Sequence, residues 1–557
     1  MSGGHAGRSP GGPWDQLGDF TATRRLIPIA AIAIVIGVLA AFVALALLRL
    51  IALFTNVFFF QTWSFDEAAP AHHHLGPLVI VLPIIGGLLI GLMARFGSSK
   101  IRGHGIPEAL ESIMLRGSRV EPKVAVLKPV SAAISIGSGG PFGAEGPIIM
   151  PGGAFGSLIA QAFRMTAAER KTLLVAGAAG GMAATFGTPI AATLLAVELL
   201  LFELKPRSVI PVALAAASAM AARYYLFPTE ALFPVPAHAS AFAVEALFAA
   251  VACGLGAGVL SLLMTRSVYL FEDLFERLPI HWMWWPAVGG LVIGIGGFIE
   301  PRALGVGYDS IGGLLAGHMT LRAIAMLVVV KWTIWSFSLG SGTSGGVLAP
   351  LLMIGAALGA LLGHVLPFEG EGFWALVTMA AILGGTMRAP LTGTLFAVEV
   401  THDYGAMLPI AIASVVAFGF TVLSLRRSIL TEKLVRRGYH ISREYAIDPL
   451  EVLFVRDVVT VGEPQQPPPH ANPLAEDCRV ELDDTLRMAA HRMARLEVTI
   501  LPVVDRDGWF LGEIALGDVL KARLRHLEEE TRRERVLPVH KLTGWIPLPP
   551  FMRPGSR

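Results

Sequence analysis

The sequence is poor in charged residues. Only 15% of its 557 residues are Asp, Glu, Lys or Arg, against about 25% in ordinary soluble domains. A soluble chain of this size needs more polar side chains to cover its core, so a plain cytosolic enzyme and a disordered chain are excluded. The formal net charge is only +2, and nucleic-acid partners usually demand a strong basic field. We therefore expect no nucleic-acid partner.

Cysteine and catalytic motifs are scarce as well. The two cysteines, Cys253 and Cys478, lie far apart in different kinds of sequence, which excludes a disulfide framework. The phosphate-binding pattern GxxxxGK(S/T) and the zinc pattern HExxH do not occur. We predict a protein that is not an enzyme, with no metal site and no cofactor.

Hydrophobic residues, by contrast, make up 54% of the chain. Residues 26–48 are apolar throughout and long enough to cross a bilayer at about 20 residues per span. Further apolar stretches lie near 77–95, 125–163, 172–202, 208–224, 241–266, 284–299, 322–338, 346–365, 374–401 and 405–425. Several are short or interrupted by Gly and Pro, which is typical of broken membrane helices. The pattern predicts an all-α polytopic membrane protein with helices of uneven length and tilt.

Charge and composition also predict the domain boundaries and the orientation. Arg24 and Arg25 precede the first apolar run, and the sequence becomes basic after Arg426. Because positive segments favour the cytoplasmic side, we expect a multi-pass protein of the inner (plasma) membrane with both termini in the cytoplasm. The predicted parts are a cytoplasmic N-terminal segment 1–25, a membrane domain 26–428, a cytoplasmic tail 429–545 and a flexible C-terminus 546–557.

The membrane domain contains an internal repeat. GSG at 137–139 precedes Pro147, and GSG at 340–342 precedes Pro350 at an offset of 203 residues. The segment PIAATLLAVE at 189–198 matches PLTGTLFAVE in the same order. Two halves, about 26–225 and 240–428, are therefore expected. Internal repeats in polytopic proteins indicate a transporter or channel with its site between the halves.

Three segments share glycines followed by a proline and an apolar helix: GHGIP at 103–107, GAEGP at 143–147 and GVLAP at 346–350. Proline suits the first helical turn because its missing N–H has no partner there anyway. A helix N-terminus carries about half a positive charge and unpaired amides, so it attracts anions. One such segment alone reads as a turn; three together predict an anion path inside the membrane.

These segments resemble the signature regions of the CLC family of chloride channels and proton-coupled chloride transporters. GHGIP is similar to the family's GSGIP, GAEGP to its G(K/R)EGP and GVLAP to its GxFxP, and SILTEKLVRRG follows in the expected order. The resemblance covers about 26–440. It implies about 18 tilted helices in two inverted repeats, a homodimer with one pore in each subunit, and chloride or another small anion as the transported ion across the lipid bilayer.

The resemblance assigns the external gating carboxylate to Glu145. A glutamate there competes with the anion and leaves the site when it is protonated. An ionisable residue in an apolar Gly-rich segment is functional by default; the alternative is a glutamate that only favours the helix dipole. The implied anion-binding set is His104, Gly105, Ile106, Gly143, Ala144, Gly146, Gly346, Val347, Leu348, Ala349 and Leu430.

Several positions depart from the family pattern. His104 replaces the serine of GSGIP, and Leu430 replaces the coordinating tyrosine. A histidine predicts either pH-sensitive anion binding or simple packing as a neutral imidazole. Leu348 replaces the aromatic of GxFxP, a modest apolar change, and Ala144 replaces an arginine or lysine, which weakens anion attraction at the outer mouth. The identity of the transported anion is therefore left open among chloride, bicarbonate, nitrate, fluoride and other small anions.

The proton path departs from the family as well. The position of the family's internal glutamate is Leu199, with Glu198 before it and Glu203 four residues on, on the face of Leu199 if the helix continues. Glu198 and Glu203 are therefore the candidate proton-path residues, while Glu399, the repeat partner of Glu198, is expected to be structural. The missing carboxylate favours a passive anion channel gated by Glu145. The alternative is a proton-coupled antiporter on the same fold.

Two lysines in apolar stretches, Lys128 and Lys331, are expected either to line a vestibule or to snorkel to the surface. The tail resembles a CBS module, a small α/β domain, with FVRDVVTV as a strand, a helix at 483–498, and two strands and a closing helix at 500–524. Ala515 stands where nucleotide-binding versions carry Thr or Ser, which argues against an adenine nucleotide. A membrane sensor is a further alternative for the whole chain, but sensing alone does not need duplicated Gly–Pro helix starts.

Overall fold

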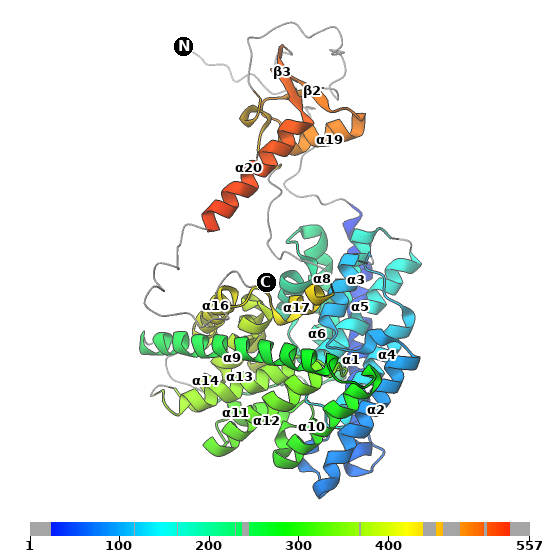
Figure 1. Ribbon diagram of the computed structural model, residues 1–557, viewed down its shortest axis with the longest axis vertical. Helices are drawn as coiled ribbons and strands as arrows, with labels where there is room; N and C mark the ends of the chain where they lie inside the picture. The colour runs from blue at the N-terminus through cyan, green and yellow to red at the C-terminus, as the bar shows by residue number, and fades with distance from the viewer. Residues whose placement is uncertain are drawn as a thin grey trace. The chain divides into compact units, whose positions relative to one another are not determined.

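The computed structural model describes residues 24–115, 117–163, 165–228, 230–236, 244–366, 369–437, 450, 453–459, 479–505 and 509–534. The chain divides into two compact units, 1–443 and 444–557. The first unit is helical and the second holds a small three-stranded sheet, as Figure 1 shows. The boundary predicted at 428 falls inside the first unit. The predicted segments 1–25 and 546–557, Cys478 and the proline-rich stretch 464–470 lie outside the described residues, apart from Arg24 and Arg25.

The first half of the membrane unit runs through α1 (Leu26–Thr55), η2 (Asn56–Phe60), η3 (Pro70–His72), η4 (Gly76–Ile80), α2 (Val81–Phe96), η5 (Ser99–Ile101), α3 (Ile106–Leu115), α4 (Pro122–Gly137), α5 (Glu145–Ala162), α6 (Ala167–Phe186), α7 (Pro189–Leu195), η6 (Ala196–Leu201) and α8 (Pro206–Leu226). The second half comprises α9 (Val244–Glu276), η7 (Trp282–Trp284), α10 (Trp285–Ile299), η8 (Pro301–Ala303), α11 (Tyr308–Leu315), α12 (Leu321–Gly340), α13 (Leu348–Gly363), α14 (Glu371–Met387), α15 (Pro390–Thr401), α16 (Met407–Ser424) and α17 (Ile429–Arg436).

Local sequence explains many of these helix starts. Proline occupies the first turn of α4, α7, α8, α10 and α15, where its missing N–H costs nothing. Thr166 and Glu169 form a capping box that starts α6. Among the described residues, seven helical segments are long and apolar enough to cross a membrane. The predicted polytopic all-α class with tilted helices of uneven length is confirmed.

The two halves pack in the same way. Helix α5 lies on α6 as α13 lies on α14, and α1 lies on α8 as α9 lies on α16. The halves meet where α2 crosses α10 and α7 crosses α15. An added Cβ at Gly87 would stand 2.3 Å from the Pro286 carbonyl oxygen, and one at Gly290 would stand 2.2 Å from the Pro83 carbonyl oxygen. These paired glycines let the α2 and α10 backbones touch, as small residues do at membrane helix crossings.

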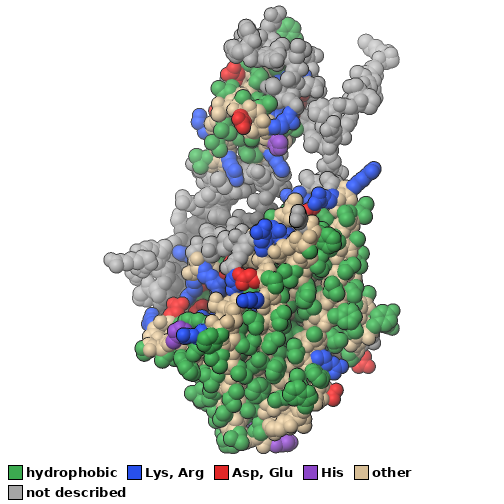
Figure 2. Space-filling view, turned by 90° about the vertical axis from the view of Figure 1, so that its right-hand side faces the viewer, with side chains coloured by type: hydrophobic (Ala, Val, Ile, Leu, Met, Phe, Trp, Pro, Cys, Tyr) green, Lys and Arg blue, Asp and Glu red, His purple; other side chains and the backbone are tan. Residues whose placement is uncertain are grey.

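Hydrophobic side chains cover a broad face of the membrane unit, and Lys and Arg gather along one border of that face (Figure 2). Exposed large apolar side chains occur along α1, α2, α9 and α16, among them Val35, Leu89, Leu255 and Val415. Because lipid replaces water at such a surface, these side chains incur no hydrophobic penalty there. The outer surface therefore suits a bilayer.

The second unit contains η9 (Val455–Asp457), β1 (Val480–Glu481), α19 (Leu486–Leu496), β2 (Ile500–Val504), β3 (Phe510–Ala515) and α20 (Leu516–Glu534). Strand β2 pairs parallel with β1 and antiparallel with β3. The predicted order of a helix, two strands and a closing helix over 483–524 is confirmed, whereas β1 has no counterpart in the prediction. The prediction of a strand at FVRDVVTV is wrong for residues 455–457. There Asp457 accepts a hydrogen bond from the Phe454 amide at 2.9 Å and closes a short 3-10 turn.

Candidate functional site

The three glycine-rich segments converge, as the sequence predicts. Gly143 and Gly346 exchange two backbone hydrogen bonds, with N···O distances of 3.3 and 3.0 Å. The Gly103 amide donates to the Thr343 carbonyl at 3.3 Å. An added Cβ at Gly146 would stand 1.9 Å from the His104 carbonyl oxygen. The starts of α3, α5 and α13 are thus joined backbone to backbone, and only glycine permits this approach.

Glu145 lies at this junction. It is the first residue of α5 and is only 1% exposed. Its carboxylate lies over the Cα atoms of Gly143 and Gly346, because added Cβ atoms there would meet Oε2 at 1.8 and 2.8 Å. The backbone amides of Glu145 and Ala349, at the starts of α5 and α13, interact with this carboxylate, although neither contact has the geometry of a regular hydrogen bond. The carboxylate therefore occupies the place where the helix N-termini favour an anion.

The rest of the predicted anion-binding set is buried around this carboxylate. His104 is 3% exposed and its Nδ1 has no hydrogen-bond partner among the described residues. Its neighbours Gly103 and Gly105 take φ values of +87° and +90°, which side chains other than glycine rarely adopt. Fully or almost fully buried as well are Gly105, Ile106, Ala144, Gly146, Val347, Leu348, Ala349 and Leu430. Apart from His104, these side chains are apolar or absent, so backbone amides are the main donors for an anion.

Tyr308 is a polar residue at the site that the sequence analysis missed. Its hydroxyl is buried, has no hydrogen-bond partner in the described part of the chain, and interacts electrostatically with Glu145. The ring packs edge to face against Phe186 and Phe233, at centroid distances of 6.3 and 5.8 Å. A signal existed in the sequence, because GVGYD at 305–309 repeats the glycine spacing of GHGIP.

Glu108 is a second residue that the sequence analysis passed over. It is 8% exposed, and its Oε2 accepts the Gly105 amide at 2.8 Å. Its other oxygen lies 3.3 Å from the Lys433 Nζ and 3.7 Å from an Arg437 nitrogen. These ion pairs tie α17, which carries Leu430, to the start of α3. Glu108 thus positions the loop around His104.

The two buried lysines neither snorkel nor face a vestibule. Both are 0% exposed. Lys128 Nζ donates to the carbonyls of Ile101 and Gly103 at 2.7 and 2.6 Å. Lys331 Nζ donates to the matching carbonyls of the second half, at 2.9 Å each. Lys331 also interacts electrostatically with Glu145, so it supplies positive charge near a site where Ala144 supplies none.

The acidic residues near the predicted proton path have different surroundings. Glu198 accepts hydrogen bonds from the Leu391 and Thr392 amides at 3.2 and 2.9 Å, and Glu399 accepts from the matching amides at the start of α7. Each glutamate thus caps a helix of the other half. The interpretation that Glu203 shares the face of Leu199 is wrong, because the helical run ends at Leu201 and Phe202 is left-handed, with φ 53°.

Glu203 instead lies outside the helices, next to basic side chains. Its carboxylate is 3.2 Å from the Lys171 Nζ and 2.6 Å from the Ser208 hydroxyl. Burial raises the pKa of this carboxyl, but the Ser208 hydrogen bond and the Lys171 charge outweigh burial and bring the pKa below its ordinary value. No group of three or more metal-ligating side chains occurs within the described ranges.

Comparisons with known proteins agree with this geometry. A family model described as voltage gated chloride channel matches residues 85–422. The H(+)/Cl(-) exchange transporter ClcA of Klebsiella pneumoniae is 29% identical over 432 residues, covering 72% of this chain and 88% of its own length. A ClcB-like chloride channel protein of Ralstonia nicotianae is 29% identical over 350 residues, 61% of this chain and 81% of that protein.

Solved structures share the fold. The crystal structure of a slow cyanobacterial Cl-/H+ antiporter aligns with a TM-score of 0.62 at 22% identity, over 75% of this chain and 98% of that chain. The membrane unit therefore has the same architecture as a solved antiporter of this kind.

Proposed function

The chain belongs to the voltage gated chloride channel (CLC) family, and from this premise we propose that it exchanges chloride for protons, with Glu145 as the protonated carrier. The burial of the Glu145 carboxylate over Gly143 and Gly346 carries the proposal. An anionic carboxylate and a chloride ion compete for one site flanked by helix N-termini. Protonation removes the charge and frees the site, so anion entry and proton uptake are linked.

The similar proteins favour exchange over passive conduction, which the sequence alone puts first. Proteins named H(+)/Cl(-) exchange transporters match 72% of the chain. Passive conduction stays the second candidate because Leu199 occupies the position of the family's internal glutamate. Leu199 is 0% exposed and its side chain cannot carry a proton. A proton in this chain therefore needs a route other than Leu199, and the sequence candidates are Glu198 and Glu203.

The deciding experiment is flux in liposomes. The reconstituted chain is given an outward chloride gradient, and chloride efflux and internal pH are recorded together. Exchange predicts that efflux drives protons inward against their gradient. Efflux with no proton movement would refute exchange and support the channel. Glu145→Gln should abolish proton movement and keep chloride flux, whereas Glu276→Gln, an exposed position at the end of α9, should change neither.

Orientation and assembly are proposed on separate observations. Arg24, Arg25 and the basic segment 426–437 support an inner-membrane protein with both termini in the cytoplasm, because positive segments favour the cytoplasmic side. A homodimer is proposed because α7 and α15, which pack against each other, expose Ile190 and Leu391 at 56% and 57%. Cysteine accessibility from each side tests the first proposal. Cross-linking through Leu391→Cys tests the second.

A further inference from the structure

A cavity of about 700 Å³ lies on the membrane unit between α9, α12 and the α16–α17 connection. Its wall is apolar on the side of α9, where Leu263 and Leu270 are 43% and 64% exposed. Trp332 of α12 also lines the cavity, with its ring nitrogen bound to the Ser267 hydroxyl at 2.9 Å. Because α9 is one of the membrane-crossing candidates, this wall suits hydrocarbon chains better than water.

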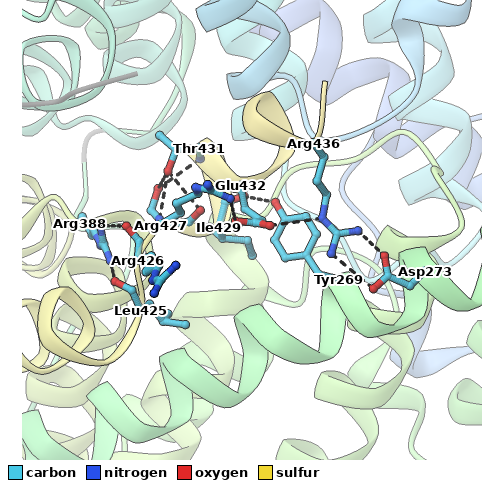
Figure 3. A network of polar contacts seen from close by, with 11 residues as sticks. Tyr269, Asp273, Arg388, Leu425, Arg426, Arg427, Ile429, Thr431, Glu432 and Arg436 are labelled. Atoms are coloured by element: carbon cyan, nitrogen blue, oxygen red, sulfur yellow. Dashed lines mark hydrogen bonds and ion pairs between the residues drawn. The ribbon is translucent and has the colours of Figure 1, made fainter. Parts of the chain in front are cut away.

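The rim of the cavity is basic. It contains Arg266, Arg426, Arg427 and Arg436, together with two carboxylates. The carboxylates already have partners: Asp273 pairs with Arg436, and Glu432 lies 3.3 Å from Arg427 and 3.4 Å from Arg436 (Figure 3). The exposed guanidinium groups of Arg266 and Arg426 have no ion-pair partner among the described residues. Two cationic groups are thus left for a ligand.

Arg266 extends from α9, and the α16–α17 connection that carries Arg426 is held in place. Arg388 donates to the Leu425 carbonyl, and the Tyr269 hydroxyl donates to the Ile429 carbonyl (Figure 3). Arg388 also donates to the Thr421 carbonyl at 3.2 Å. Ser428 caps α17. The arginine side chains therefore extend from fixed backbone, which lowers the entropic cost of binding a ligand.

We propose that this cavity binds the phosphate headgroup of an anionic phospholipid. Arginine binds phosphate oxygens through paired N–H donors, and basic pockets between membrane helices on the cytoplasmic side suit anionic headgroups. The unpaired charges of Arg266 and Arg426 match the phosphate, and the apolar wall at Leu263 and Leu270 matches the acyl chains. A free phosphate ion would use the charges and leave the apolar wall exposed, so the lipid is the better occupant.

Trp332 provides a local probe of the site. The full-length protein is reconstituted in phosphatidylcholine containing brominated phosphatidylglycerol, and in the reverse mixture. The difference in fluorescence between wild type and Trp332→Phe isolates quenching at this tryptophan. We expect brominated phosphatidylglycerol to quench Trp332 more strongly than brominated phosphatidylcholine at equal mole fraction. In the double variant Arg266→Gln/Arg426→Gln this preference should fall by about 25-fold, since each arginine near a membrane surface contributes roughly fivefold.

The control is Arg322→Gln, which removes an exposed arginine at the start of α12 and outside the cavity and should leave the preference intact. Equal quenching by the two lipids, or a preference that survives in the double variant, would overturn the proposal. Displacement of the brominated lipid by soluble glycerol phosphate would also overturn it and assign the arginines to a free phosphate. The readout does not involve transport, so it stands whether or not Glu145 couples chloride to protons.

Discussion

Replacing Gly143 by alanine tests directly whether the Glu145 carboxylate occupies the anion path. An added Cβ would stand 1.8 Å from Oε2, 2.4 Å from Cδ and 2.5 Å from Oε1 of Glu145, and these are its three nearest neighbours. Gly143 is absent from the glycines with positive φ, so alanine fits the backbone there. The substitution therefore acts on the carboxylate and spares the surrounding fold.

The displacement follows from the distances. To reach an ordinary contact of about 3.5 Å, the carboxylate must move by roughly 1–2 Å. If it stayed in place, overpacking would cost about 1–3 kcal/mol. That energy changes the ratio of occupied to vacated sites by roughly fivefold to a hundredfold in favour of vacancy. Gly143→Ala should therefore behave like a partial removal of the Glu145 side chain.

The assay is chloride efflux with simultaneous internal pH in liposomes. We expect faster efflux and fewer protons moved per chloride than in wild type. Gly256→Ala is the matched control, because its Cβ would make only ordinary contacts at 3.7 and 3.9 Å and should leave both quantities unchanged. Wild-type flux and coupling in a correctly folded Gly143→Ala protein would refute the placement of the carboxylate over Gly143 during transport.

Other substitutions test the remaining contacts. Tyr308→Phe removes a buried hydroxyl that has no partner in the described part of the chain and that we expect to donate to the transported chloride. It should weaken the apparent chloride affinity in flux assays by about five- to tenfold, the value of one hydrogen bond of roughly 1 kcal/mol or slightly more. Lys331→Met leaves two buried carbonyls without donors, at about 1–3 kcal/mol each, and should lower the thermal unfolding temperature; an unchanged temperature would contradict its role as a buried tie. Glu399→Ala removes the side-chain cap of α7 and should lower the free energy of unfolding by about 1 kcal/mol. The same thermal assay should show this as a lower unfolding temperature. Because the pKa of Glu203 lies below its ordinary value of 4.5 in the folded chain, its stabilising contribution is full above that value and lost as the pH falls. Glu203→Gln should thus be less stable than wild type at neutral pH and equal to it in acid, and a difference that persists in acid would be inconsistent with the ion pair.

The part of the site that is built from glycine- and proline-containing helix starts can be predicted from the sequence, because these segments recur in both halves. GAEGP and GVLAP occupy equivalent places in two halves, so their meeting follows once the halves pack as a pair. The surroundings of Glu203 do not follow, because helical periodicity gives no warning of the left-handed residue Phe202 that ends the run. The environment of Lys331 is missed for a similar reason. Its partners are carbonyls about 28 residues away, and sequence shows side chains more readily than unpaired backbone atoms.

The comparison of the two halves separates structural from chemical residues. The helix caps Glu198 and Glu399, the crossing glycines of α2 and α10, and the lysine ties occur in both halves and make matching contacts. At the offset of 203 that relates Pro147 to Pro350, Glu145 corresponds to Leu348. The carboxylate of one half thus faces an apolar helix start in the other.

The same asymmetry holds at the glycine loops. His104 corresponds to Val306, and Ile106 corresponds to Tyr308, when GHGIP is set against GVGYD. The two halves therefore have nearly equivalent backbones at the junction. Glu145, His104 and Tyr308 each occur in one half only, opposite an apolar residue in the other half. The proposed mechanism, with one protonatable carboxylate, requires this arrangement, because a second carboxylate at position 348 would place two like charges at one junction and hold one of them protonated. In the proposed exchange, the asymmetry at these three pairs therefore confines proton binding and anion competition to one carboxylate.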